Sequence, residues 1–226
     1  MFMRSCALSA AAACLIAASG CATETSHTVQ VQQVQAAAAP YAGARVPVSI
    51  GKFDNHSSFM RGVFSDGVDR LGGQARGALV AHLQQSQRFA VQDRDNLAES
   101  GQELKIRGAS QSLRGASYLI TGDIAEFGRK ETGDEQLFGL LGRGKHQVAY
   151  AKITLNVIDT ATSEVVFSAS GAGEYELSNR EVIGFGGTAG YDATLNGKVI
   201  DLAMRDAVDR VAAAKDAGQW GREERR

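Results

Sequence analysis

Residues 147–159 read QVAYAKITLNVID and form the most regular pattern in the chain. Every second side chain is apolar, which is the period of a β-strand with one buried face. The side chains predicted to face the core are Ala149, Ala151, Ile153, Leu155 and Val157. A turn at 160–164 and an apolar run at 165–170 follow, so the sequence predicts a β-hairpin here.

Elements of both kinds precede and follow this hairpin. Apolar patterns predict further strands at residues 46–51, 89–92 and 118–127. Helical spacing predicts helices at 71–87 and 195–214, and Asp93 is a candidate N-cap for another that carries Leu97 and Leu104. The order β-α-β-α-β-β-β-α predicts an α+β, or layered α/β, fold with a mixed β-sheet flanked by helices.

The first 20 residues have the organisation of a lipoprotein signal peptide. Arg4 precedes an apolar run too short to span a bilayer, and two small residues stand directly before Cys21. A small-small-Cys ending is what the bacterial lipoprotein peptidase recognises, with lipid placed on the cysteine thiol. We therefore predict a signal peptide at 1–20 and a lipid-bearing N-terminus at Cys21. Ala22, in place of Asp, favours the outer membrane, with the domain facing the periplasm.

Processing at Cys21 also sets the expected cysteine content, because Cys6 and Cys14 lie within the signal peptide. The domain is expected to fold without a disulfide. The formal charge changes from −1 to −2 when Arg4 is lost, and this near-neutral charge gives no argument for nucleic acid. The mature chain divides by composition into a flexible tether at 21–45, a domain at 46–214 and a charged tail at 215–226.

Residue patterns typical of enzymes are lacking in the sequence, so no catalytic residue, cofactor or metal is predicted. There is no Gly-x-Ser-x-Gly elbow, and the histidines have no metal-ligand spacing. Residues 139–145 match seven positions of a P-loop but precede a strand, where a P-loop precedes a helix. Asp123 and Glu126 are expected on opposite faces of a strand, and His82 at the surface or boundary.

Two glycine-punctuated segments, 127–150 and 169–193, are too long for tight turns. Each could form an extended hairpin. Hairpins from many subunits could close one oligomeric transmembrane β-barrel, because only closed barrels satisfy strand backbones in lipid. The alternative interpretation is that both segments are surface loops.

The chain resembles the CsgG-type curli production assembly/transport lipoproteins over nearly all of residues 46–214. The resemblance rests on motifs of the core and turns: Val48-Ser49-Ile50 with Phe53-Asp54, ALVAHLQQSQRF at 78–89, Asp93-Arg94-Asp95-Asn96-Leu97, Tyr118-Leu119-Ile120-Thr121-Gly122, and ITLNVIDTATSE at 153–164. It implies that subunits form a homo-oligomeric ring in the outer membrane and that each gives two hairpins to one barrel.

The resemblance also implies that the loop after the first strand, residues 54–70, narrows the pore. In a gapless alignment the three family positions that form the constriction fall on Gly62, Asp66 and Gly67. Phe59 and Phe64 lie nearby and complete the candidate constriction loop.

Two functional interpretations remain. One is a subunit of a secretion channel that exports a curli-like fibre or adhesin protein together with accessory secretion proteins. The other is a periplasm-facing lipoprotein of the same fold that binds or activates a partner without forming a channel.

Overall fold

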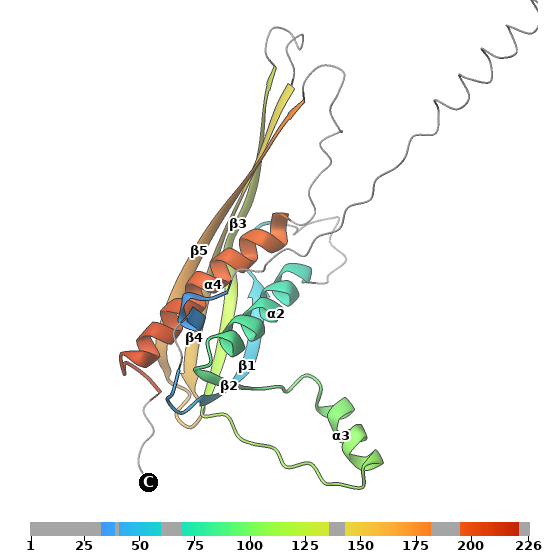
Figure 1. Ribbon diagram of the computed structural model, residues 1–226, viewed down its shortest axis with the longest axis vertical. Coiled ribbons are helices and arrows are strands. Elements are labelled where there is room, and N and C mark those ends of the chain that lie inside the picture. Colours follow the sequence, from blue (N-terminus) through green and yellow to red (C-terminus); the bar gives the residue numbers. More distant parts are fainter. Residues whose placement is uncertain (1–32, 39–40, 60–68, 136–142, 182–194, 222–226) are drawn as a thin grey trace, which may run out of the picture. The chain divides into compact units, whose positions relative to one another are not determined.

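The computed structural model describes residues 33–38, 41–59, 69–135, 143–181 and 195–221 (Figure 1). It confirms the α+β fold and the predicted order of elements, which a short 3-10 helix precedes. The elements are η1 (Gln35–Ala38), β1 (Val46–Asn55), α2 (Arg70–Gln85), β2 (Phe89–Gln92), α3 (Leu97–Ile106), β3 (Tyr118–Glu135), β4 (Arg143–Asp159), β5 (Val165–Glu181) and α4 (Leu195–Asp216).

The strands form one mixed sheet in the order β2-β1-β3-β4-β5. Strand β1 runs parallel to both of its neighbours, β2 and β3. Strand β4 is antiparallel to both β3 and β5. Helix α2 connects the parallel strands β1 and β2, because a parallel pair needs a crossover. The antiparallel strands β4 and β5 need only the short turn that the sequence predicts.

Helices α2 and α4 cover the same face of the sheet (Figure 1). The alternation along β4 is confirmed, because all the residues predicted to face the core have 0% exposure. Against them α4 places its buried stripe, which includes Val199, Ala203 and Val208. The alternating apolar face of β4 and the helical apolar stripe of α4 therefore pack together in one core.

Helix α4 approaches β5 closely because two glycines on that strand face it. A Cβ atom at Gly171 would lie 2.3 Å from the backbone oxygen of Ala203 and 2.3 Å from the backbone nitrogen of Ala207. A Cβ atom at Gly173 would lie 2.9 Å from the backbone nitrogen of Ala203. The missing side chains let the helix backbone rest directly on the strand.

Strands β3, β4 and β5 are longer than the sequence patterns predict, with 18, 17 and 17 residues. Their pairing continues to Glu135↔Arg143 and Arg143↔Glu181. Strand structure therefore covers the described residues of the candidate hairpin segment 127–150 and the first part of segment 169–193. Residues 182–193, the rest of the second segment, lie outside the described residues. The described end of the P-loop-like run lies in β4, a strand and not a helix.

Two expectations about polar residues are wrong. The register of β3 shifts between Ile124 and Glu126, so Asp123 pairs with Thr154 and Glu126 with Lys152. Both acidic residues therefore lie on the same face of the sheet. The N-cap of α3 is Asn96 and not Asp93. The Asp93 carboxylate instead accepts from the backbone N–H of Asp95 at 2.9 Å, as in an Asx turn.

The described domain extends past both of the boundaries that composition predicts. Val34 belongs to the segment predicted to be a flexible tether, yet it is 2% exposed and part of the core. Trp220 belongs to the predicted charged tail, yet it is 4% exposed. Its ring stacks on Phe89 and meets the ring of Tyr118 edge-on. Composition misses both because one buried side chain is enough to fasten a polar segment.

Candidate functional site

Phe59 is the one predicted site residue within the described part of the chain. The others lie outside the described residues: Cys21, Gly62, Phe64, Asp66 and Gly67. The Phe59 ring packs against the ring of Phe127 on β3, with centroids 4.6 Å apart. It is partly buried against the core. This side chain therefore anchors the beginning of the candidate loop to β3.

The candidate loop is held at both of its ends. At its start, the side-chain amide of Asn55 donates to the backbone carbonyl of Phe59 at 3.2 Å. At its end, the Asp69 carboxylate accepts from the backbone N–H groups of Asn55 and Gly72, each at 2.7 Å. Asp69 thus caps α2 and ties the start of that helix to the end of β1. Phe59 and Asp69, the described residues on either side of 60–68, are therefore both held at the end of β1.

That place lies beside β3. The backbone N–H groups of His56 and Ser57 donate to the carbonyl of Ile124 on β3, at 3.0 and 3.1 Å. Because β1 and β3 are parallel, β3 continues past this point toward Glu135. The candidate loop therefore starts where the long β3–β4 pair extends beyond β1.

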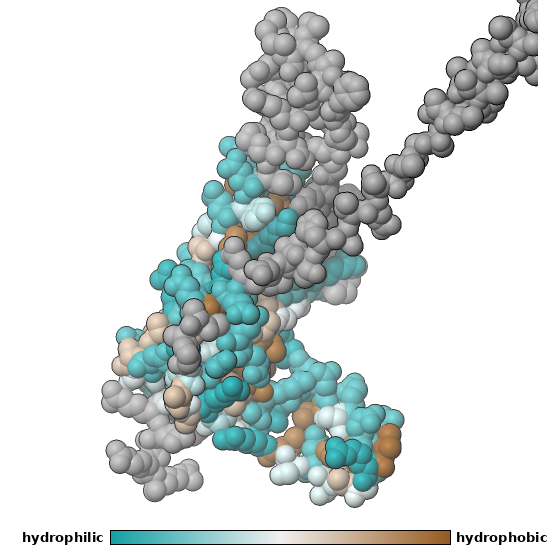
Figure 2. Space-filling view, in the orientation of Figure 1, coloured by the Kyte–Doolittle hydropathy of each residue, from teal (hydrophilic) through white to brown (hydrophobic). Residues whose placement is uncertain are grey.

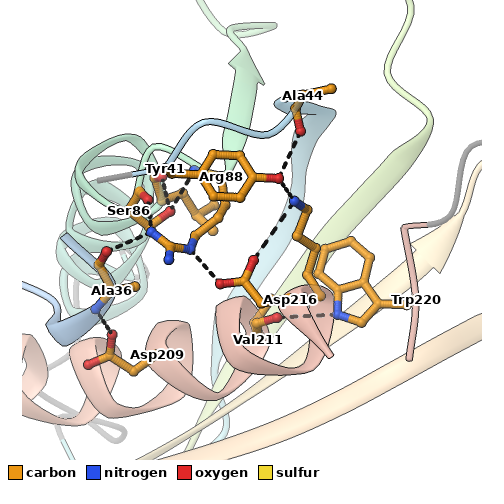
Figure 3. A network of polar contacts seen from close by, with 11 residues as sticks. Ala36, Tyr41, Ala44, Ser86, Arg88, Asp209, Val211, Asp216 and Trp220 are labelled. Atoms are coloured by element: carbon orange, nitrogen blue, oxygen red, sulfur yellow. Dashed lines mark hydrogen bonds and ion pairs between the residues drawn. The ribbon is translucent and has the colours of Figure 1, made fainter. Parts of the chain in front are cut away.

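A second polar centre lies at the C-terminal end of α4, and the sequence patterns did not predict it (Figure 3). Its hub is Arg88, which is only 7% exposed. The guanidinium donates to the Asp216 carboxylate at 2.9 Å. It also donates to the backbone carbonyls of Ala36 and Ser86, at 2.6 and 2.8 Å. This centre joins the N-terminal segment, the start of β2 and α4. Its only sequence signal is an arginine directly before an apolar strand.

The ring of Tyr41 completes this centre. The Arg88 guanidinium lies 4.9 Å and the Lys215 ammonium 4.1 Å from the ring centroid, which are cation–π distances. The Lys215 ammonium also donates to the Tyr41 hydroxyl. Burial lowers the pKa of Lys215, and the Asp216 carboxylate opposes that shift. Two cations, each paired with the Asp216 carboxylate, thus contact an aromatic ring from the N-terminal segment.

His82, expected at the surface or boundary, is 1% exposed. Its Nε2 atom lies 2.8 Å from a carboxylate oxygen of Asp201 on α4, and its Nδ1 atom lies 3.2 Å from the amide oxygen of Gln85. The expectation fails because the histidine belongs to the buried stripe of α2. Its contact with Asp201 is a polar link between the two helices.

The described residues contain no group of three or more histidine, cysteine or acidic side chains that could hold a metal ion. Among the described helices, none is long and apolar enough to cross a membrane.

Comparison with known proteins finds a relative of high identity. The protein named "Putative lipoprotein NMB1126/NMB1164" from Neisseria meningitidis serogroup B is 57% identical over 209 residues, covering 92% of this chain and 94% of that protein. Two solved structures are similar at low identity. The PelC dodecamer from Paraburkholderia phytofirmans has 14% identity and a TM-score of 0.34, covering 75% of this chain and 91% of that one. Lipoprotein GNA1162 from Neisseria meningitidis has 11% identity and a TM-score of 0.33, covering 76% and 99%.

The family model described as curli production assembly/transport component CsgG matches residues 29–218. The matched range includes the buried Val34 and the whole of α4. Together with the meningococcal relative, this match shows that the chain belongs to the CsgG family.

Proposed function

We propose that this lipoprotein is a subunit of an oligomeric outer-membrane channel that exports a curli-like fibre or adhesin protein. Membership of the CsgG family supports the proposal. The observation that carries it is the length of β3, β4 and β5. At the start of α4 the Asn196 side chain accepts from the Arg129 guanidinium on β3 at 3.1 Å. The strand pairing continues past this contact as a three-stranded ribbon of residues 130–135, 143–148 and 176–181.

The ribbon extends the sheet beyond the part that helices α2 and α4 cover. At about 3.3 Å per residue, residues 130–135 add roughly 20 Å to β3. Among the described strands, none pairs with the outer edge of β3 or of β5 in this ribbon. Such edges favour pairing with another chain. In the channel, ribbons from neighbouring copies pair edge to edge and close one barrel, which satisfies their backbone groups in lipid. Cys21 carries the lipid that holds each copy at the membrane.

The candidate constriction loop starts at the base of this ribbon. Phe59 and Asp69 fix its two ends beside β1 and β3. In a ring, every copy of the loop would converge on the same axis, so Asp66 would form a ring of negative charge. Such a ring favours cations. Purified lipidated protein in planar bilayers should conduct with cation preference, and Asp66→Asn should weaken that preference without abolishing conductance.

Glu164→Gln is the matched control, because Glu164 is exposed in the turn between β4 and β5. It removes one carboxylate charge per copy away from the loop, so it should leave ion selectivity unchanged. Unchanged ion selectivity in Asp66→Asn would show that the loop does not line the pore. No conductance from folded, lipidated protein would contradict the channel itself.

Self-association has a candidate surface on α3. None of the residues of α3 is buried. Ile106 is 71% exposed and Leu113 is 56% exposed. Figure 2 shows hydrophobic surface at α3 and the segment beside it, among hydrophilic residues. A short helix without packing is marginal in water, so we expect α3 to be covered by the next copy in the ring.

The segment that carries α3 is fixed at its base. The Arg76 guanidinium on α2 donates to the Asp95 carboxylate at 2.9 Å. Arg94 donates to the Arg114 carbonyl at 2.6 Å, which ties the two ends of the segment together. The position of α3 relative to α2 is therefore constrained. This suits a contact that must recur with the same geometry around a ring.

Negative-stain imaging of detergent-purified protein tests this contact. Wild type should form rings, and Ile106→Asp combined with Leu113→Asp should yield folded single subunits. Val165→Asp is the control, since Val165 is 52% exposed but begins β5, at the end of that strand remote from the ribbon. It should leave the rings intact. Rings that persist in the double variant would show that α3 is not part of the contact between subunits.

The exposed surface of α3 also fits the second candidate function, a periplasm-facing lipoprotein that binds or activates another protein. Blocking lipidation with Cys21→Ser separates the two functions. A partner-binding module would then be released from membranes, whereas a channel subunit would stay associated through its barrel. Mass spectrometry of the mature N-terminus checks the anchor, and cleavage anywhere except before Cys21 would contradict it.

A further inference from the structure

The N-terminal segment before β1 is docked on the domain. Residues 33–38 and 41–45, here called the strap, contact the C-terminal half of α4. Val34 is buried in the core at 2% exposure. The next two backbone N–H groups, of Gln35 and Ala36, donate to the two carboxylate oxygens of Asp209 on α4, each at 3.1 Å. The Asp209 side chain therefore accepts hydrogen bonds from two successive backbone amides of the strap.

The strap is also held from its other side (Figure 3). The Ala36 carbonyl accepts from Arg88, whose guanidinium is fixed by the Asp216 carboxylate. Farther along, the Tyr41 ring lies against Arg88 and Lys215. The groups that hold the strap thus belong to α4 and to the segment before β2. The strap itself supplies backbone groups, one valine and one aromatic ring.

These contacts alter the length of chain that can span from the anchor to the domain. Cys21 is 13 residues from Val34 and 25 residues from Val46. At about 3.5 Å per residue, the docked strap limits the reach of a lipid on Cys21 to roughly 45 Å, whereas a released strap would allow roughly 85 Å. Docking of the strap therefore roughly halves the greatest possible distance between the lipid on Cys21 and the folded domain.

Two physical arguments favour reversible docking of the strap. Ordering the strap costs backbone entropy at every residue, and few of its side chains return free energy by burial. Local opening of such a segment exposes Val34 but leaves the sheet intact, because β1 begins only at Val46. We propose that the strap is a releasable latch, closed by Asp209 and Arg88, which sets the reach of the lipid anchor. The reach rests on the proposed lipidation at Cys21; the docking does not.

Hydrogen exchange of the full mature chain in detergent tests the latch. Amides 35 and 36 should be protected in wild type, and Asp209→Ala should speed their exchange at least tenfold. Asp206→Ala is the matched control, because Asp206 lies three residues earlier on α4 and contacts Arg210 and the backbone of β5. It should change exchange of the strap less than twofold. The fluorescence of Trp220 should remain native in both variants.

A second variant acts from the strap itself. Gln35→Pro removes one donated N–H and leaves α4 intact, so it should also open the strap. Chymotrypsin gives an independent readout, since release should speed cleavage after Tyr41 severalfold. Rapid exchange at amides 35 and 36 in wild type, or equal exchange in wild type and Asp209→Ala, would overturn the latch. The same measurements on Cys21→Ser protein separate this result from a failure of the proposed lipidation.

Discussion

Replacement of Gly171 by alanine tests the contact between α4 and β5. The added Cβ atom would lie 2.3 Å from two backbone atoms of α4, belonging to Ala203 and Ala207, and 2.9 Å from the Ala207 Cα atom. Ordinary contact begins near 3.4 Å, so the helix must move by about 1 Å. No flexible side chain can yield instead. Overpacking of this kind costs about 1–3 kcal/mol, and a clash with backbone atoms on two sides places Gly171→Ala at the upper end.

Urea unfolding of the mature protein measures this cost. The protein has one tryptophan, Trp220, which is buried just after α4 and reports on the packing of that helix. Gly171→Ala should lower the free energy of unfolding by about 2–3 kcal/mol, which corresponds to a fall of roughly 4–12 °C in melting temperature. Gly128→Ala is the control, because a Cβ atom there meets nothing within 4 Å.

The control should be neutral or slightly stabilising, since alanine restricts the unfolded chain more than glycine does. If Gly171→Ala unfolds at the same urea concentration as Gly128→Ala, α4 does not rest on β5 at this position. The packing of the helix on the sheet would then have to be revised.

Three further predictions concern the core and the polar contacts. Ile153→Ala should lower the free energy of unfolding by about 2–5 kcal/mol, because Ile153 is fully buried on the core-facing side of β4; a urea midpoint equal to that of wild type would show that the register of β4 is wrong. His82→Leu should cost about 1–2 kcal/mol through loss of the hydrogen bond to Asp201, and no loss in thermal unfolding would show that this link contributes nothing. Burial lowers the pKa of Lys215 below 10.5, so between the lowered pKa and 10.5 the unfolded chain binds more protons and the stability contribution of Lys215 should rise with pH. As pH rises through this range, the urea midpoint of Lys215→Met should therefore decrease relative to that of wild type. A constant difference between the two midpoints at every pH would contradict this.

The order of elements could be predicted because it depends on local periodicity. The alternation along β4 and the helical stripe of α4 each follow from which side chains must leave water, whatever their partners are. The ends of the strands could not be predicted in this way. The pattern in β3 continues into charged and glycine-rich residues, and these remain in a strand only because β4 lies beside them and pairs with their backbone.

The same distinction applies to single residues. The family was recognisable from short motifs, since turns and caps depend on neighbours in the sequence. Burial of His82 and Arg88, by contrast, depends on Asp201 and Asp216, which lie 119 and 128 residues away. A charged or polar side chain enters the core only where a partner compensates its loss of water, and the fold alone brings that partner near. Likewise the alanine-rich segment before β1 has no signal for docking, because Asp209 on the last helix is what holds it.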